Sequence, residues 1–571
     1  MKFDKETIIV FVVCMILLVS VEPLFRYMGW IPPKAVDQKE AVSGRKQSGQ
    51  DQKAVSGAAT KTALTSAAKD VKKPVAPVKE IPQLPPRMIG DDSTELQIDP
   101  NRGTVLSVTL KNYFNSDKKS PIVLDKGIES GALNVSGVHP WKTLAVIDSN
   151  RISPKIYSLT RRMAAGEKEF ILIQEWSVSG FVTDYSITIK NPADKTLTFE
   201  KLNVVAGGMP MLKELTGDKV DRDEHRISFY STAKGYDDED VDDEEDFNDF
   251  KSESELTWVA SSNKYFTTIL KSDRPFDADM FKERLVDPSR QKDKDAPAIG
   301  VVGGSWSGIE VPAKGQVVLK AWSYNGPKEL ALLEKFDKTA INVVSLAPGP
   351  LKWIARVLLA LLLWLYNICG SYGWSIILLT LIVRGLLWPL TQRANQSMKR
   401  MQKLKPEIDK INEKYSDNPQ MKNTKVMQLY RDHKINPVGG CLPILLQIPI
   451  FIALYNTLNG AVQLRQVSFL WAADLTMPDT VATIFGLGIH PLVLMMTGLM
   501  LLQQKMMPTP ADAMQQKMMM MMPLVMLVFL YNLPSGLTLY WTVSQICSIA
   551  QMYINQKVMK DPDDQAAASK G

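Results

Sequence analysis

The sequence is poor in the residues that usually bind metals or form disulfides. It contains 4 cysteines and 4 histidines among 571 residues. The cysteines lie in apolar stretches, at Cys14, Cys369, Cys441 and Cys547, so the polar part of the chain has none that could form a disulfide. Neither the cysteines nor the histidines show the spacing of a metal site, and we therefore predict no metal and no cofactor.

Motifs for covalent catalysis or nucleotide binding are absent as well. The polar part of the chain has no GxSxG, Walker or GxGxxG pattern, which mark nucleophile elbows, phosphate loops and dinucleotide-binding turns. The net charge of +6 is modest for this length and does not favour binding to nucleic acid. We therefore predict that the protein is not an enzyme and has no specific nucleic-acid partner.

What the sequence does contain is a set of long apolar runs on either side of a polar region. Residues 1–28 carry two lysines and then an apolar stretch that no A-x-A-like cleavage site follows. This pattern predicts an uncleaved signal anchor with its N-terminus in the cytoplasm. The later apolar runs lie at residues 351–369, 374–390, 441–459, 481–502, 519–533 and 536–556.

The polar region between these runs divides into two parts by composition. Residues 29–98 are rich in alanine, lysine, proline, serine and glutamine, which predicts a disordered periplasmic linker. Residues 99–345 alternate apolar and polar positions and contain many β-branched and aromatic residues, which predicts an all-β sandwich. The acidic run 237–249 lacks the glycine and spacing of an EF-hand loop, so we interpret it as a solvated, mobile loop rather than a calcium site.

Charge in the connecting segments predicts the orientation of the apolar runs. The segment 391–440 contains 11 lysines and arginines against 5 acidic residues, so it is expected on the cytoplasmic side. If residues 346–370 also crossed the membrane, the basic segment 391–440 would lie on the periplasmic side. We therefore predict six transmembrane helices, the anchor and five within 371–556, and an amphipathic helix lying in the membrane interface at 346–370.

The basic segment has a helical pattern of its own. Between residues 392 and 436, apolar residues recur at heptad-like spacing before a break at Asn418-Pro419, and helical spacing then resumes with Met427 and Tyr430 inward. The first apolar series is Met401, Leu404, Ile408, Ile411 and Tyr415. This pattern predicts a cytoplasmic helical hairpin. Its basic faces suit RNA or acidic proteins, although an ordinary solvated face is the alternative.

One charged residue stands inside an apolar run. The stretch 374–390 reads WSIILLTLIVRGLLWPL and carries Arg384. An arginine within a membrane span costs from about 2.5 to more than 10 kcal/mol, depending on its access to water. Thr380 lies on the same helical face, which allows a polar stripe. The alternative is that Arg384 only extends its side chain to the headgroups.

Three motifs in the apolar region resemble one family, the YidC/Oxa/Alb membrane protein insertases of the Gram-negative YidC type. They are TLIVRGLLWPLT (380–391), NPVGGCLPILLQIPIFIALY (436–455) and NLPSGLTLYWTVSQ (532–545). The resemblance implies a polytopic α-helical membrane protein of the bacterial inner membrane, with both termini cytoplasmic. It also implies five helices around a hydrophilic groove that is open to the cytoplasm, and a large periplasmic β super-sandwich similar to sugar mutarotases.

The resemblance also implies roles for particular residues. Arg384 would be the positive charge of the groove, and Thr380 and Trp541 would line the path of an entering helix. Many relatives have tyrosine where Trp541 stands. The remaining polar candidates for the groove are Gln447, Ser544 and Gln545.

The function that the resemblance implies is insertion and folding of nascent inner-membrane proteins, alone or with the Sec translocon. The expected partners are nascent membrane proteins, the Sec translocon, the lipid bilayer, and the ribosome or signal-recognition components through the hairpin. The tail 557–571 is short and of mixed charge, unlike the long basic tails of some relatives. The alternatives are a secondary transporter and a membrane-anchored periplasmic carbohydrate-active enzyme.

Overall fold

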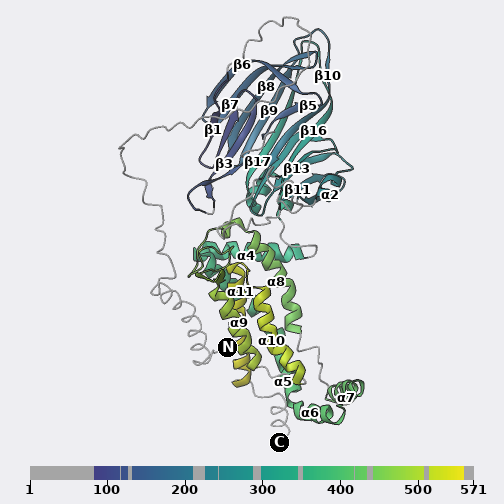
Figure 1. The fold of residues 1–571 in the computed structure, drawn as a ribbon, viewed down its shortest axis with the longest axis vertical. Coiled ribbons are helices and arrows are strands. Elements are labelled where there is room, and N and C mark those ends of the chain that lie inside the picture. Colours follow the sequence, from purple (N-terminus) through teal and green to yellow (C-terminus); the bar gives the residue numbers. More distant parts are fainter. Residues whose placement is uncertain are drawn as a thin grey trace, which may run out of the picture.

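The computed structural model, shown in Figure 1, describes ten stretches of the chain. They are residues 83–115, 117–125, 131–209, 225–241, 244–286, 298–344, 351–416, 418–433, 442–506 and 513–557. The predicted signal anchor at 1–28, most of the predicted linker at 29–98 and all but the first residue of the tail at 557–571 lie outside these stretches.

A β domain forms the first part of the described chain, over residues 87–327. Its largest sheet has nine antiparallel strands, in the order β12, β11, β13, β14, β17, β9, β8, β7 and β6. Their bounds are Gly235–Asp240, Arg226–Ser231, Leu256–Ser262, Phe266–Phe276, Gln316–Pro327, Val182–Lys190, Lys168–Ser179, Ile156–Ala165 and Trp141–Ser153. The prediction that this region is built mainly of β-strands is confirmed.

Two smaller antiparallel sheets complete the β domain. One has the order β15 (Phe281–Val286), β16 (Ala298–Val311), β10 (Leu197–Gly208) and β5 (Val135–Gly137). The other has the order β1 (Arg87–Gly90), β2 (Thr94–Asp99), β3 (Thr104–Phe114) and β4 (Pro121–Leu124). Alternating side chains from these sheets share one apolar core, in which Trp176 stacks between Tyr157 and Tyr185 at ring distances of 5.9 and 5.3 Å.

The predicted boundary between linker and β domain is wrong by about a dozen residues. Strand β1 and all of β2 except its last residue, Asp99, lie within the segment 29–98 that was expected to be disordered. In β2, Leu96 and Ile98 are fully buried and alternate with half-exposed Gln97 and Asp99. The alternation was visible in the sequence, but the proline- and lysine-rich composition before it obscured where the alternation began.

The interpretation of the acidic run 237–249 as a mobile loop is also wrong. Residues 235–240 form β12, and Glu244–Asp249 form the helix α2. The helix is held because Phe247 is buried in the core and because Lys282 Nζ donates 2.6 Å hydrogen bonds to the carbonyls of Phe247, Asn248 and Phe250. A lysine at these carbonyls offsets the negative end of the helix.

The chain then passes from the β domain into helices. The short elements α3 (Leu330–Phe336) and η2 (Ala340–Val343) pack against the nine-stranded sheet around Trp258. Helix α4 (Lys352–Cys369) follows and runs crosswise between the β domain and the helices below it (Figure 1). One face of α4 is buried, whereas Trp353, Trp364 and Ile368 on the other face are exposed.

Five further helices lie below α4 and form what we call the helical bundle. They are α5, α8, α9, α10 and α11. The bounds of α5, α8 and α9 are Tyr372–Lys403, Leu442–Gly460 and Pro491–Met506, and those of α10 and α11 are Ala513–Phe529 and Ser535–Lys557. In the part of the chain that the structure describes, α4 and α5 are the two helices long and apolar enough to cross a membrane, while α9 and α10 have only 16 and 17 residues. The apolar run 481–502 is not one helix, because its first part forms the strands β18 (Ala482–Ile484) and β19 (Leu487–Ile489).

A helical hairpin projects from the end of the bundle opposite the β domain, with α6 at Lys405–Lys414 and α7 at Pro419–Asp432 (Figure 1). The predicted inward positions Leu404, Ile408 and Tyr430 form its buried cluster. The prediction for Met427 is wrong, because its side chain is 45% exposed and the neighbouring Val426 packs on the cluster instead. The predicted buried face of α7 is therefore shifted by one residue along the helix.

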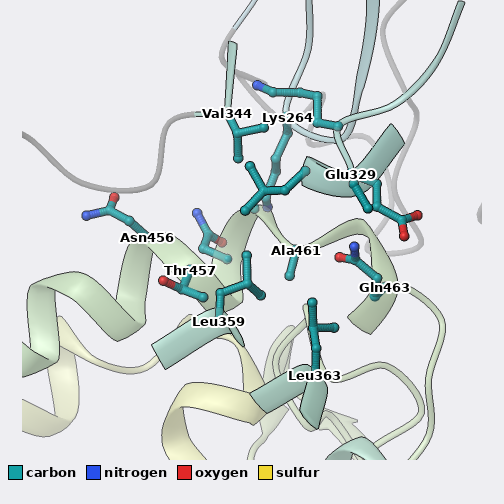
Figure 2. Close-up of a pocket in the computed structure, with 14 residues that line it drawn as sticks. Lys264, Glu329, Val344, Leu359, Leu363, Asn456, Thr457, Ala461 and Gln463 are labelled. Carbon is teal, nitrogen blue, oxygen red and sulfur yellow. The ribbon is translucent and has the colours of Figure 1, made fainter. Parts of the chain in front are cut away.

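The β domain meets the helices through hydrogen bonds and a small cavity. Arg465 Nη1 donates to the carbonyl of Phe114 at 2.6 Å, and Gln466 Nε2 donates to that of Asn115 at 2.7 Å. The cavity, of about 80 Å³, lies between Lys264 and Glu329 of the β-domain side and the end of α8 (Figure 2). Its floor includes Leu359 and Leu363 of α4, and Glu329 is hydrogen-bonded to Gln463. Burial raises the pKa of the Glu329 carboxyl.

Candidate functional site

Arg384 occupies the middle of α5, in a stretch whose other residues are mostly apolar. The helix begins after the extended Ser371 and continues for 32 residues, through Pro389, to the basic turn at Lys403. Because 12 of the 17 residues at 374–390 are Leu, Ile, Val or Trp, this part of the helix is apolar, and the helix packs against α4, α8 and α11. Arg384 is therefore carried into the space between helices, where it is only partly exposed.

The guanidinium of Arg384 connects three helices. Its Nε donates to Ser544 Oγ of α11 at 2.6 Å, and its Nη2 donates to Gln447 Oε1 of α8 at 3.0 Å. Nη2 also contacts Ser544 Oγ, and Gln447 Nε2 donates to the same hydroxyl at 3.3 Å. The structure thus brings together three of the six residues named from the sequence.

Tyr540 is a member of this cluster that sequence reasoning missed. It is 1% exposed, and its phenol hydrogen-bonds with Ser544 and Gln447. Tyr540 precedes Ser544 by four residues on α11, so it lies on the same helical face. That spacing could have identified Tyr540, but the neighbouring Trp541 was predicted to line the groove instead.

The charge of Arg384 has no acidic counterpart on the helices around it. The described residues of α5, α8, α9, α10 and α11 include no aspartate or glutamate. The hydrogen-bond acceptors at the guanidinium are a hydroxyl and an amide oxygen, both neutral. The cluster therefore satisfies the geometry of the arginine but leaves its positive charge uncompensated, which favours attraction of an anionic group.

Thr380 lies on α5 one turn before Arg384 but is not hydrogen-bonded to it. Its side chain is fully buried, and its hydroxyl donates to the carbonyl of Ile376 at 2.7 Å. Thr538 and Thr542 of α11 use their hydroxyls in the same way on Pro534 and Thr538. These hydroxyls are satisfied within their own helices, so Thr380 presents its methyl group rather than a polar atom to its neighbours.

Trp541 and Gln545 flank the cluster on α11. The half-buried indole of Trp541 meets the ring of Phe451 on α8 edge-on, at 4.7 Å between centroids. Gln545 is half-buried, and none of the described hydrogen bonds of Arg384 goes to it. Trp541 therefore belongs to the α8–α11 contact beside the cluster, and Gln545 lies at its edge.

Further polar contacts between α5 and α11 follow toward the hairpin end of the bundle. Gln551 Nε2 donates to Thr391 Oγ1 at 2.9 Å, and Lys399 Nζ donates to the carbonyl of Asn555 at 2.9 Å. The α5–α11 seam is thus polar at intervals, and the arginine cluster is the member of this series nearest to the β domain. A polar seam of this kind suits a passage into which water and charged segments enter.

The two histidines of the β domain do not form an acid–base pair. His139 is exposed, whereas His225 is 2% exposed and neither of its ring nitrogens has a hydrogen-bond partner among the residues that the structure describes. Burial lowers the pKa of His225 to about 4, so it is neutral at physiological pH. A buried histidine without a partner cannot reach a sugar in solution, which argues against a carbohydrate-active site built on these residues.

Comparison with known proteins identifies relatives over most of the chain. Residues 88–361 match the family model described as YidC periplasmic domain, and residues 364–563 match the one described as 60Kd inner membrane protein. A membrane protein insertase YidC of Syntrophobacter fumaroxidans is 46% identical over 235 residues, which cover 40% of this chain and 42% of that protein. That of Pelobacter propionicus is 33% identical over 479 residues, covering 80% of this chain and 84% of that protein.

Solved structures show weaker likenesses. A crystal structure of active YidC insertase with its first transmembrane domain resolved is 18% identical and covers 85% of this chain and 95% of that one, with a TM-score of 0.35. A putative aldose 1-epimerase of Escherichia coli is 12% identical and covers 42% of this chain and 98% of that one, with a TM-score of 0.28.

Proposed function

The chain belongs to the YidC family of membrane protein insertases, and from this premise we propose that it inserts nascent proteins into the bacterial inner membrane. The observation that carries the proposal is the Arg384 cluster. A guanidinium held by Ser544 and Gln447, without a carboxylate on the surrounding helices, is costly in a membrane. Such a cost is expected where the charge interacts with a client segment that moves across the membrane.

In the proposed mechanism, Arg384 attracts acidic residues of a client segment that must cross the membrane. A hydrophilic groove between α5, α8 and α11 shortens the apolar distance, and the client's own apolar helix then slides past Thr380 and Trp541 into lipid. Transfer of that helix from water to hydrocarbon supplies the driving force, so neither a nucleotide nor covalent chemistry is required. The polar seam at Thr391 and Gln551 supports a path for water from the hairpin end.

We further propose a topology of six transmembrane helices, with the β domain in the periplasm and both termini in the cytoplasm. The crosswise course of α4 between β domain and bundle supports its assignment to the membrane interface rather than to a span (Figure 1). The exposed Trp353 and Trp364 of α4 suit that location, because tryptophan favours the headgroup region. The hairpin α6–α7, at the opposite end of the bundle, would then be cytoplasmic.

The proposed partners follow from this orientation. The buried seam of the hairpin directs Lys410 and Lys414 to solvent, which suits the ribosome or signal-recognition components. The Sec translocon is proposed as a second partner in the membrane. A secondary transporter or a carbohydrate-active enzyme would instead require a bound small molecule, and the family membership and the positions of the histidines favour the insertase.

The proposal is tested by insertion into proteoliposomes that contain Arg384→Ala, Arg384→Lys or Lys505→Ala. Arg384→Ala is expected to slow insertion of clients with acidic translocated tails about tenfold, which corresponds to about 1.4 kcal/mol of lost attraction. Clients with neutral tails should be affected less, and Arg384→Lys should largely preserve activity. Lys505→Ala removes an exposed cation in the last turn of α9, outside the α5–α11 seam, and serves as the matched control.

Crosslinking supplies a second test. Photoreactive groups placed at Thr380 and Trp541 should form adducts with a nascent membrane protein, because both positions flank the proposed path. An insertion rate that is unchanged in Arg384→Ala for every client, together with an absence of adducts, would show that the bundle does not guide clients past this cluster.

A further inference from the structure

A two-stranded hairpin lies between α8 and α9, at the end of the bundle that faces the β domain. Its strands β18 and β19 pair antiparallel, with Ile484 opposite Leu487, so Phe485 and Gly486 alone form the turn. Both turn residues have positive φ angles, +52° at Phe485 and +80° at Gly486. This is the turn geometry in which Asn-Gly or Asp-Gly is usual.

The tip of this hairpin is apolar and exposed. The side chain of Phe485 is fully exposed at 101%, and those of Ile484 and Leu487 are 51% and 65% exposed. The segment between Asp479 and His490 reads TVATIFGLGI and contains no charged residue. A bulky residue at positive φ is conformationally costly, so an apolar side chain is present at a position where a small polar one would fit better.

The base of the hairpin is fixed to the bundle. Val481 N donates to the carbonyl of Ile489 at 3.0 Å, and Thr480 Oγ1 contacts His490 Nδ1 at 3.2 Å. The hydroxyl of Tyr531, just beyond α10, donates to the carbonyl of Gly488, and its ring packs edge-on against His490 at 4.6 Å. The exposed tip therefore has a fixed direction and is not a loose connection.

The hairpin continues the apolar outer surface of the bundle. In the last turns of α10, Val528 and Phe529 are 75% and 78% exposed, and Leu524 and Val525 are about half exposed. Tyr531, which holds the hairpin, follows Phe529 by two residues. In a bundle that spans a membrane, such side chains contact lipid. The hairpin tip is thus attached where that lipid-facing surface ends.

We propose that the β18–β19 hairpin is a membrane anchor, whose tip enters the apolar boundary of the outer lipid leaflet beside α9 and α10. The occupant is phospholipid, because the tip lacks charge and adjoins side chains that already face lipid. The proposal rests on the membrane location of the bundle and is independent of which clients it inserts. A tip that contacts a protein partner instead is one of the outcomes that the test distinguishes.

The test places a nitroxide spin label at Phe485→Cys in the full chain, reconstituted in phosphatidylethanolamine–phosphatidylglycerol vesicles. The native cysteines Cys14, Cys369, Cys441 and Cys547 are first replaced by alanine. Collisions with oxygen report lipid, and collisions with a water-soluble nickel chelate report water. Labels at Val528→Cys on α10 and at Val318→Cys on β17, which is 44% exposed, are the lipid and water controls.

The oxygen-to-nickel collision ratio at position 485 is expected to resemble that at 528 and to exceed that at 318 at least about threefold, since an inserted tip lies in the acyl boundary. A label at Leu487→Cys should report the same location and replaces position 485 if that variant does not fold. A ratio equal to that at 318, or an immobilised label that neither reagent reaches, would overturn the proposal. Client insertion is measured separately, so its loss does not alter this result.

Discussion

The β domain and the helical bundle satisfy their buried polar groups in opposite ways. In the β domain the partners are far apart in the sequence. Gln174, for example, donates to the carbonyl of Gly103 at 2.9 Å and accepts from Arg161 Nη2 at 2.6 Å. In the bundle a set of buried threonines has local partners, since the hydroxyl of each donates to the carbonyl four residues before it. They are Thr380, Thr457, Thr497, Thr538 and Thr542.

This difference explains why Arg384 stands out among the polar residues of the bundle. Hydrocarbon offers no hydrogen-bond partner, so a polar side chain in a membrane helix is most economically satisfied by its own backbone. A threonine can reach the preceding turn. The hydrogen bonds of Arg384 instead go to α8 and α11, so its guanidinium joins three helices that are far apart in the sequence.

Trp176→Ala should produce the largest difference in stability between the β domain and the helical bundle. Trp176 is fully buried between Tyr157 and Tyr185, and removing a large buried aromatic typically costs about 3–5 kcal/mol. The bundle has a separate apolar cluster, so its protection should not change. Hydrogen exchange of the full-length protein should show loss of protection across the β domain, because its sheets share one core, and no loss in the bundle.

Trp176→Phe is the matched control for this variant. The indole nitrogen of Trp176 is buried without a hydrogen-bond partner, so replacing the indole with a phenyl ring loses no hydrogen bond. The cost should therefore be well below that of Trp176→Ala. Equal loss of protection in the bundle would contradict the independence of the two clusters.

The second prediction concerns the pH dependence of the β domain. Asp125 is fully buried, and burial raises its pKa to about 7, against a hydrogen bond from Gly208 N that lowers it. The folded state therefore binds this proton more tightly than the unfolded state, and the stability contributed by Asp125 falls as the pH rises from about 4 to about 7. His225, with its pKa lowered to about 4, acts in the opposite sense between about pH 4 and pH 6.5.

Asp125→Asn should reveal the pH dependence of β-domain stability that His225 causes. The variant removes the carboxyl titration, so the β domain should gain stability as the pH rises from about 4 to about 6.5, by up to about 3 kcal/mol. At pH 8 it should be more stable than the wild type, by up to about 4 kcal/mol. Thermal unfolding of the full-length protein across this range measures both effects. The Asp125→Asn, His225→Phe double variant should lose the gain between about pH 4 and pH 6.5, which comes from His225, and keep the advantage at pH 8, which comes from removing the Asp125 carboxyl.

Lys282→Met should have a smaller and local effect. It keeps an apolar side chain beside Phe247 but removes the three hydrogen bonds to the carbonyls at the end of α2. The expected cost is about 1 kcal/mol, confined to the acidic segment 244–249. Lys314→Met, which removes a lysine paired with Asp194 on the surface of the same domain, is the control and should leave α2 protected.

Thr380→Val should have the smallest effect of all. The hydroxyl of Thr380 is already bonded to its own helix, and valine occupies a similar volume, so we expect a change of about 0.5 kcal/mol or less in bundle stability. Insertion should stay within about twofold of the wild type on the same grounds. A large loss of insertion would show that the hydroxyl leaves Ile376 when a client arrives, and would break the contrast between local hydroxyls and the arginine cluster.

The site was predictable from the sequence to different degrees at different residues. Arg384 is evident as a charge within an apolar run, and the family resemblance led to Gln447 and Ser544, which the structure brings to its guanidinium. Tyr540 was missed although its spacing from Ser544 was visible. The direction of the Thr380 hydroxyl could not be predicted, because a threonine in a helix is free either to turn back to its own backbone or to face a neighbour.

By itself the sequence determined the class of each region, because strand and helix periodicity, apolar length and charge bias are local properties of the chain. It also determined that one cation would stand in the membrane part. Only the tertiary structure decided that residues 244–249 of the acidic run form a helix held by Phe247 and Lys282, that the run 481–502 begins as a hairpin, and that Arg384 meets neutral partners on two other helices. These outcomes depend on contacts between residues far apart in the chain, which no local pattern records.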